Sequence, residues 1–240
     1  MQNASYVALS RQTALRRQLD VVAHNIANMN TTGFKNQRML FTEFLERPGM
    51  HEQVSFVQDR AVVRDTSNGG VTSTGNVLDF AINGQGYFTV DTASGRRYTR
   101  AGNFQMNDQR QIVDNGGLPV LSDNGQPMTI PDGAKEIRLA GDGTLSTELG
   151  PIGKFNIVVF PNEQLMMEVG SGLYVSDEEP QPAPAETKVA QAVLEQSNVK
   201  PILEMTSMME ILRQNQQVQR VLETEHERMR TVIQRLGRPV

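Results

Sequence analysis

The residues of this 240-residue chain that could carry out chemistry are few and far apart. The sequence contains no cysteine, which excludes disulfides, thiolate metal sites and cysteine nucleophiles. Its three histidines, His24, His51 and His226, come from distant segments, and we interpret His24 as a packed or solvated side chain. Neither a serine elbow nor a Ser/His/Asp pattern occurs. We therefore predict no catalytic, cofactor-binding or metal-binding residue.

Some glycine-containing turns resemble ligand-binding motifs only in part. Gly84-Gln85-Gly86 shares two glycines with a nucleotide-binding turn, but the residues that follow are typical of a strand where that motif needs a helix. Asp142-Gly143 and similar pairs lack the alternating ligands and the closing glutamate of an EF-hand. We interpret all of them as ordinary turns. The scattered acidic residues leave a carboxylate hydrolase unproven rather than excluded.

Glycine and charge divide the sequence into two ends and a middle. Of the 20 glycines, 17 fall between Gly69 and Gly172. Residues 61–187 carry 8 basic and 16 acidic side chains, whereas residues 1–60 and 188–240 each have a net charge of +2. The total charge of -4 argues against a nucleic-acid-binding protein.

The sequence predicts neither membrane insertion nor a secretory signal. The most apolar stretch, at 155–160, has six residues, far below the roughly 20 that a spanning helix needs. Arg11, Arg16, Arg17 and Asp20 interrupt the place where a secretory signal would have its apolar run. The three arginines would serve a DNA-binding coiled coil, but a solvated helix face is the simpler interpretation.

Both ends of the sequence predict helices with one apolar stripe each. The N-terminal stripe has spacings of 4 and 3 residues, and the C-terminal one alternates 3 and 4 in a heptad seam. The N-terminal stripe is Ala8, Gln12, Leu15, Leu19, Val22 and Ile26. The C-terminal seam is Met205, Met208, Leu212, Asn215, Gln219, Leu222, His226, Met229, Ile233 and Leu236. We expect the second helix over residues 201–236, roughly 54 Å long at 1.5 Å per residue.

The two predicted helices differ in length, and a helical stripe is stable only when it is buried. If the helices pack together, much of the longer seam stays uncovered and needs neighbours. Asn215, Gln219 and His226 interrupt this seam, as polar positions do when they fix coiled-coil register. The alternative is a monomer whose terminal helices pack on its own middle domain, and the sequence leaves both arrangements open. The methionines of the second helix favour an adaptable binding surface.

The middle of the sequence predicts antiparallel strands. Leu78, Phe80 and Ile82 alternate with polar or small residues at a period of two. Further short runs follow, separated by turn signals such as Asn115-Gly116-Gly117, which is typical of a sandwich or barrel. Three prolines mark residues 177–188 as a stiff acidic linker.

We therefore predict an α+β, multidomain fold, in which paired N- and C-terminal coiled-coil-like helices flank an inserted antiparallel all-β domain. Phe41, Phe44 and Leu45 hint at a short helix in a region that otherwise favours extended structure. The expected domains are an N-terminal helix segment at 1–35, an extended linker region at 36–72, a β domain at 73–176, a Pro-rich acidic linker at 177–188 and a C-terminal helix segment at 189–240.

Several blocks of the sequence resemble the flagellar basal-body rod and hook family, which builds the axial tube of the bacterial flagellum. They lie in family order at 3–12, 25–35, 74–88, 98–104, 194–199 and 204–206. The 25–35 block, Asn25-Ile26-Ala27-Asn28-Met29-Asn30-Thr31-Thr32-Gly33-Phe34-Lys35, looks like that family's N-terminal signature. Two positions depart from the family pattern: Ala192 stands where glycine is common, and Asp108-Gln109-Arg110 lacks a glycine usual in that hairpin.

The resemblance implies a non-enzymatic structural subunit of the periplasm-spanning flagellar rod, exported from the cytoplasm by the flagellar type III apparatus. It implies terminal helices that pair at the inner wall of a tube and a β domain that faces outward. The expected partners are other rod subunits and copies of the chain itself, with no nucleic acid, membrane insertion, small-molecule substrate or cofactor. The short length favours the proximal over the distal rod, and a soluble enzyme with a site in the β domain is the alternative from another class.

The candidate site is thus a set of interface and signature residues. We expect Asn25, Asn28 and the Thr31-Thr32-Gly33 turn to end the first helix, with Gly33 in the left-handed conformation. The signature residues that the resemblance points to are Asn25, Asn28, Thr32, Gly33, Phe34, Ser197 and Asn198. The expected subunit interface is Leu15, Leu19, Val22, Ile26, Met205, Met208, Leu212, Asn215, Leu222, His226, Met229, Ile233 and Leu236.

Overall fold

The computed structural model describes residues 2–46 and 54–236, which fall into two compact units. We call Met1–Ala27, Gln37–Arg64 and Lys200–Val240 the helix unit. Asn28–Asn36 and Asp65–Val199 form the β unit. Each unit is therefore assembled from segments that lie far apart in the sequence. The terminal helices and the antiparallel strands confirm the predicted α+β class.

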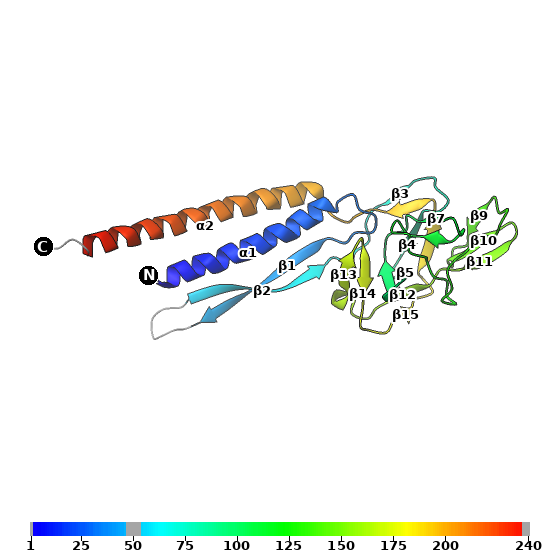
Figure 1. The fold of residues 1–240 in the computed structure, drawn as a ribbon, viewed down its shortest axis with the longest axis horizontal. Helices are drawn as coiled ribbons and strands as arrows, with labels where there is room; N and C mark the ends of the chain where they lie inside the picture. Colours follow the sequence, from blue (N-terminus) through cyan, green and yellow to red (C-terminus); the bar gives the residue numbers. More distant parts are fainter. Residues whose placement is uncertain (1, 47–53, 237–240) are drawn as a thin grey trace. The chain divides into compact units, whose positions relative to one another are not determined.

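The helix unit contains two long helices that lie side by side, α1 at Gln2–Ala27 and α2 at Pro201–Leu236 (Figure 1). The bounds of α2 confirm the helix predicted over residues 201–236. Proline is well tolerated at its first position, because the fixed φ suits a helix and the missing N–H has no intrahelical partner there. Since α2 has 36 residues and α1 has 26, the last turns of α2 run beyond the start of α1 (Figure 1).

A β-hairpin completes the helix unit and corrects the prediction for residues 36–72. Its strands are β1 at Gln37–Glu46 and β2 at Val54–Arg64, which pair antiparallel and contact α1. The region is extended as expected, but it forms an element of the helix unit rather than a linker. Phe41 and Phe44 have helical spacing, yet pairing with a second strand outweighs this local signal. Residues 47–53 lie outside the described residues.

The β unit consists of short antiparallel strands. Six form one sheet in the order β13-β14-β6-β5-β12-β15, three form a second in the order β11-β10-β9, and the others pair as β16-β4, β17-β3 and β7-β8. The strands are β3 Val71–Ser73, β4 Phe80–Asn83, β5 Tyr87–Thr92, β6 Gly95–Thr99, β7 Gln105–Met106, β8 Ile112–Val113, β9 Ile137–Leu139, β10 Thr144–Thr147, β11 Gly150–Lys154, β12 Ile157–Val159, β13 Met167–Gly170, β14 Leu173–Val175, β15 Gln181–Pro182, β16 Lys188–Gln191 and β17 Val193–Glu195. One 3-10 turn, Glu163–Leu165, precedes β13.

Aromatic side chains form the centre of the β unit. Phe80 and Phe88 both meet Phe155 edge to face, with ring centroids 4.9 Å and 5.3 Å apart. Phe88 meets Phe104 in the same way at 5.1 Å. All four rings are buried within a larger apolar cluster. These contacts explain why the alternating pattern around Phe80 predicted a strand correctly.

The C-terminal part of the β unit corrects two predicted boundaries. The expected linker at 177–188 contains β15, which pairs with β12 at the edge of the six-stranded sheet. Proline is tolerated there because an edge strand leaves one side without ladder partners. The expected helix segment at 189–240 begins with β16 and β17, so the β unit ends at Val199. Val189 is buried in the β core, although it follows a segment whose prolines favour a linker.

Ala192 has a left-handed backbone, with φ at 60°, at the position where the family pattern has glycine. Its N–H donates to the Asp79 carbonyl at 2.8 Å, and its carbonyl accepts from Thr74 N at 2.9 Å. We predict that Ala192→Gly keeps these bonds and removes a left-handed cost of roughly 1–2 kcal/mol. A more flexible unfolded chain offsets about 0.4–1 kcal/mol of that gain. Urea denaturation should therefore show a gain in stability of up to about 1.6 kcal/mol.

Arg110 provides the matched comparison, because its φ is 59° and it lies in the other hairpin that departs from the family pattern. Its guanidinium donates to the carbonyls of Ile130 and Pro131 at 3.0 and 2.8 Å. Arg110→Gly loses both bonds, so we expect no gain in stability. Equal gains from Arg110→Gly and Ala192→Gly would contradict the assignment of the benefit to backbone conformation.

Candidate functional site

The two helices of the helix unit share one apolar core. Its buried members are Leu15 and Val22 on α1 and Ile211 and Val218 on α2. The half-buried side chains packed against them are Ala8, Leu19, Ile26, Met208 and Leu222. We call these nine residues the helix-pair core. The four α1 residues predicted for the subunit interface therefore pack inside the helix pair of a single chain. They are Leu15, Leu19, Val22 and Ile26.

The predicted α2 seam divides between this core and the surface. Met208 and Leu222 join the core, whereas Met205, Leu212 and Met229 are 46%, 40% and 38% exposed. His226 is also exposed. The side chains of Ile233 and Leu236 lie outside the described part of the chain.

Sequence reasoning missed Ile211 and Val218. A 3–4 alternation through Met208 and Leu222 can take in either Ile211 or Leu212 as the second row. Which row is buried depends on where α1 lies, and α1 selects Ile211 and Val218. The apolar residue Ile211, next to Leu212 in the sequence, was the signal available for the second possibility.

Asn215 lies in the middle of the helix pair with an unsatisfied group. Its Oδ1 is buried and accepts no hydrogen bond from the described residues. A buried acceptor without a donor costs about 1–3 kcal/mol. The predicted polar interruption of the seam is thus an energetic cost within the single chain.

Asn25 fixes the end of α1 inside the helix unit. Its side chain exchanges two hydrogen bonds with the backbone of Gln37, donating to the carbonyl at 2.8 Å and accepting from the N–H at 2.9 Å. Its amide also donates to Glu204 Oε2 at 3.3 Å. Asn25 is almost fully buried, so one signature residue joins α1, β1 and α2.

The turn after α1 belongs to the β unit and contains the next signature residues. The N–H and the hydroxyl of Thr31 both donate to Asn28, each at 3.1 Å, and Thr32 is half-buried. Gly33 has a φ of 68°, which confirms the predicted left-handed conformation. Its N–H donates to the carbonyl of Glu195 at 2.8 Å, and Phe34 beside it is buried.

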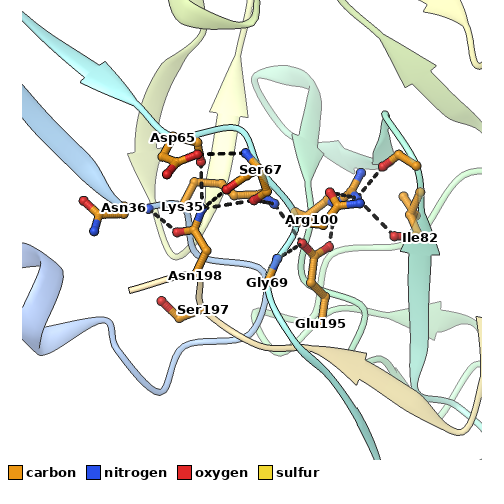
Figure 2. Close-up of polar contacts among 12 residues, drawn as sticks. Lys35, Asn36, Asp65, Ser67, Gly69, Ile82, Arg100, Glu195, Ser197 and Asn198 are labelled. Atoms are coloured by element: carbon orange, nitrogen blue, oxygen red, sulfur yellow. Dashed lines mark hydrogen bonds and ion pairs between the residues drawn. The ribbon is translucent and has the colours of Figure 1, made fainter. Parts of the chain in front are cut away.

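A buried ionic cluster of Lys35, Arg100 and Glu195 lies beside this turn (Figure 2). One carboxylate oxygen of Glu195 accepts from Lys35 Nζ at 2.7 Å, and the other accepts from Arg100 Nε at 2.6 Å. The N–H of Gly69 donates to the first oxygen at 3.0 Å. All three charged side chains are less than 5% exposed, so each charge depends on the others for stabilisation.

Arg100 also donates hydrogen bonds to backbone carbonyls of neighbouring turns. Its guanidinium donates to the carbonyls of Ile82 and Gly84 at 3.0 and 2.6 Å and to the carbonyl of Gly86. The turn Gly84-Gln85-Gly86 therefore presents carbonyl acceptors to a cation, the opposite of the N–H donors that a phosphate needs. This contact explains the turn without a nucleotide.

Asn198 ties together the segments where the chain enters and leaves the β unit. Its amide donates to the carbonyls of Asp65 and Ser67 at 2.9 and 3.0 Å (Figure 2). Its Oδ1 accepts from the N–H of Asn36 at 2.6 Å. Ser197 next to it accepts from Val199 N at 3.3 Å through its hydroxyl oxygen. Signature residues that are distant in the sequence thus meet in one place.

The electrostatics of the ionic cluster favour the charged form of Glu195. Burial alone would raise the pKa of its carboxyl, but the charges of Arg100 and Lys35, and hydrogen bonds from both, lower the pKa below its ordinary value of 4.5. A cavity of about 40 Å³ beside the cluster has room for little more than one water molecule. The ionic cluster therefore holds segments of the β unit together, and the cavity beside it has no space for a substrate.

Other candidate ligand sites are ordinary structure where the chain is described. Asp142 accepts from the N–H of Thr144 at 3.0 Å and from its hydroxyl at 2.9 Å, as in a turn. Across residues 2–46 and 54–236, no three acidic or histidine side chains gather as metal ligands would. Over the same residues, neither helix is long and apolar enough to cross a membrane.

Comparison with known families places three matching segments along the chain. Residues 6–35 match the family described as flagella basal body rod protein. Residues 81–147 match the D1 domain of the flagellar hook protein FlgE/F/G. Residues 190–235 match the C-terminal region of flagellar basal body rod FlgEFG proteins. The first and third segments include the signature residues of both termini.

Relatives that align with most of the chain are also flagellar basal-body rod proteins. The flagellar basal-body rod protein FlgF of Caulobacter vibrioides is 37% identical over 243 residues, covering 99% of each chain. FlgF of Mesorhizobium japonicum is 35% identical over 89% of each chain. The rod protein FlgG of Bacillus subtilis is 33% identical over 72% of this chain and 73% of its own.

Proposed function

The chain belongs to the flagellar basal-body rod protein family, and we propose that it joins the rod through exposed surfaces of its two terminal helices. It is a structural subunit of the rod in the flagellar basal body. FlgF of Caulobacter vibrioides is 37% identical over 99% of the chain, against 34% over 90% for FlgG of the same organism, which favours the proximal over the distal rod.

The observation that carries the proposed assembly surface is the division of the α2 seam. Leu15, Val22 and their partners cover one another, which leaves Met205, Leu212 and Met229 exposed in the single chain. Apolar residues that keep a heptad spacing while exposed are suited to coiled-coil packing against another helix. Neighbouring subunits of the rod, including copies of the chain, supply that helix in our proposal.

Polar seam positions give this packing its register. Asn215 keeps a buried acceptor unsatisfied in the single chain, and His226 is exposed on the same seam. Polar side chains at seam positions favour one alignment of packed helices over the others. We therefore assign both residues a role in alignment between subunits.

The chain acts by assembly rather than catalysis in this proposal. The buried charged groups of Lys35, Arg100 and Glu195 are hydrogen-bonded to each other and to backbone groups. Their function is to hold the entry and exit segments of the β unit together. As the family resemblance implies, we also propose delivery by the flagellar type III export apparatus.

The proposed surface is tested by Leu212→Asp. Leu212 is exposed, so the free energy of unfolding of the monomer should change by less than about 0.5 kcal/mol. A charge in an apolar contact between subunits should abolish rod assembly and swimming. Isolated basal bodies and swimming assays measure both effects.

Two further variants complete the experiment. Thr224→Asp places the same charge on an exposed position outside the seam and should leave assembly intact. Leu222→Asp, in the helix-pair core, should both destabilise the helix unit and block assembly while the β unit still folds. Normal swimming of the Leu212→Asp strain would refute the proposed surface.

A further inference from the structure

Asparagine followed by glycine is a sequence at which a protein chain can react with itself, and asparagine is among the thermolabile residues. The backbone nitrogen of the glycine attacks the side-chain carbonyl carbon of the asparagine, and a glycine has no side chain to obstruct the approach. The β unit contains four such pairs, Asn68-Gly69, Asn83-Gly84, Asn115-Gly116 and Asn124-Gly125. All four asparagines are exposed, so exposure alone does not distinguish them.

In three of the pairs a hydrogen bond holds the glycine N–H that would have to attack. These bonds run from Gly69 to Glu195 Oε1 at 3.0 Å, from Gly116 to Asp114 Oδ1 at 2.8 Å and from Gly125 to the carbonyl of Ser122 at 2.8 Å. The bond must break before the nitrogen can react, which slows the attack by roughly two- to tenfold, and by more where the acceptor is a carboxylate.

The N–H of Gly84 is different, because it donates to no acceptor among the described residues. The N–H of Ala192 donates to the carbonyl of Asp79 on the edge where β4 pairs with β16. Backbone groups of a strand alternate between its two edges, so the carbonyl of Asn83, four residues after Asp79, faces β16 as well. In a trans peptide the next N–H points the opposite way, toward the edge where Arg100 binds. A guanidinium has only donors, so it cannot hold this N–H.

The charge of Arg100 also favours the attack at this pair. The nitrogen reacts in its deprotonated form and the attacked carbonyl becomes an oxyanion, and a nearby cation stabilises both. Arg100 donates to the carbonyls of Ile82 and Gly84 at 3.0 and 2.6 Å, on either side of the reacting peptide bond (Figure 2). Asn115-Gly116 and Asn124-Gly125 each follow an aspartate, whose charge opposes the developing anion.

The surroundings of Asn83 leave room for the remaining steps. Its side chain is exposed at the end of β4 and can turn toward the nitrogen of Gly84. The cavity of about 40 Å³ beside the ionic cluster is lined by Gly84 and Arg100 and has room for about one water molecule. Water is the only other reactant that the conversion needs.

We propose that Asn83 is a site of self-modification, at which the side-chain amide is converted to aspartate and isoaspartate without an enzyme or a cofactor. A bond forms between the nitrogen of Gly84 and Cγ of Asn83, and the side-chain nitrogen leaves as ammonia with the proton of the Gly84 N–H. The product is a cyclic imide. Water then adds to one of its two carbonyls and breaks a C–N bond. Cleavage of the new bond gives aspartate, and cleavage of the original peptide bond gives isoaspartate. The conversion consumes water and releases ammonia, and nothing is oxidised or reduced.

The isoaspartate product changes the backbone beside the ionic cluster. The main chain then runs through Cβ of residue 83, which inserts a methylene group between the carbonyls of Ile82 and Gly84. Because Arg100 binds both carbonyls in the unmodified chain, we expect it to lose one of these hydrogen bonds. The β unit should therefore unfold at a lower urea concentration after the conversion.

Peptide mapping by mass spectrometry tests the site. The purified full-length chain is kept folded at physiological temperature in isotope-labelled water, and uptake of labelled oxygen is followed at all four pairs in the same sample. Asn83 should convert roughly tenfold faster than the other three asparagines. Equal rates at Asn83, Asn115 and Asn124, or no conversion at Asn83, would overturn the proposal.

The same measurement in concentrated urea separates the fold from the local sequence. Unfolding removes the hydrogen bonds of the three other glycines and the contact with Arg100, so the four rates should converge. A preference for Asn83 that persists in urea would show that the fold does not select it, and would overturn the structural argument.

Asn83→Asp is the matched control for the effect on stability, since it carries the charge of the product without the additional methylene group. Residue 83 is exposed, so this variant should unfold at the same urea concentration as the unmodified chain. The isoaspartate form, separated by chromatography, should unfold at a lower concentration, as measured by the near-ultraviolet circular dichroism of the buried tyrosines. Identical transitions of the isoaspartate form and Asn83→Asp would refute the effect on the ionic cluster.

Discussion

Glu195→Ala is expected to destabilise the β unit by about 3–5 kcal/mol, because it leaves two buried cations without their anion. Lys35 and Arg100 lie 2.7 and 2.6 Å from its carboxylate oxygens, and none of the three side chains is more than 4% exposed. The neighbouring carbonyls of Ser67 and Ile82 still accept from them, but they carry no charge to balance. The free energy of unfolding should therefore fall by a large part of a typical domain's stability.

Three of the chain's four tyrosines offer a probe that is specific to this unit. Tyr87, Tyr98 and Tyr174 are buried together in one cluster of the β unit, and the chain has no tryptophan. Their near-ultraviolet circular dichroism during urea denaturation reports on the β unit, whereas helical signal reports mainly on the helix unit. The two transitions should separate in Glu195→Ala, with the tyrosine transition moving to lower urea.

Glu136→Ala is the matched control, since the ion pair of Glu136 with Arg138 is also 2.7 Å long but lies on the surface. An exposed pair contributes about 0–1 kcal/mol, so this variant should barely change the transition. Equal effects of Glu136→Ala and Glu195→Ala would contradict the importance of burial.

The stabilisation from Glu195 should also depend on pH. Its pKa is lower in the folded chain than the ordinary value of 4.5, so the folded state favours the charged carboxylate. The contribution is fully present above pH 4.5 and is lost as the pH falls through the lower, folded pKa. The slope from one group is at most about 1.4 kcal/mol per pH unit, and Glu195→Gln should remove it in this window.

The sequence was sufficient for elements that follow local periodicity. The bounds of α2 and the apolar row of α1 could be predicted because each depends on residues three or four apart. The strand at Phe80 could be predicted for the same reason at a period of two. The α2 seam was only half predicted, because the choice between Ile211 and Leu212 depends on the position of another helix.

The ionic cluster could not be predicted, since its members are separated by 65 and 95 positions in the sequence. Lys35, Arg100 and Glu195 each lie inside a block that resembles the family, but nothing in a single sequence pairs them. Similarly, β15 is an edge strand in a segment whose prolines favour a linker. Long-range pairing and edge positions are set by the completed fold, so local patterns do not report them.

Gly33→Ala is the second variant with a large expected effect, about 2–5 kcal/mol of destabilisation. The φ of 68° costs a residue with a Cβ roughly 1–2 kcal/mol. An added Cβ would also lie 2.6 Å from the carbonyl carbon of Arg100 and 2.8 Å from the N of Ala101. These are backbone atoms and cannot rotate away, so overpacking adds about 1–3 kcal/mol.

Gly75→Ala separates these two contributions. Gly75 has nearly the same φ, 74°, and a Cβ added there would meet nothing within 4 Å. It should cost only the left-handed term of roughly 1–2 kcal/mol, so the difference between the variants measures the close approach of Gly33 to the Arg100 segment. The tyrosine signal of the β unit measures both.

The cost at Gly33 should extend to the ionic cluster, because the N–H of Gly33 donates to the carbonyl of Glu195 at 2.8 Å. A backbone shift that relieves the clash with Arg100 lengthens this bond and moves Glu195 relative to both cations. In a double-mutant cycle, Gly33→Ala and Glu195→Ala should therefore be less damaging together than the sum of the single effects by about 0.5–3 kcal/mol. Additive effects would show that the turn and the cluster are independent. Gly33 would then be needed only for the backbone turn that follows α1.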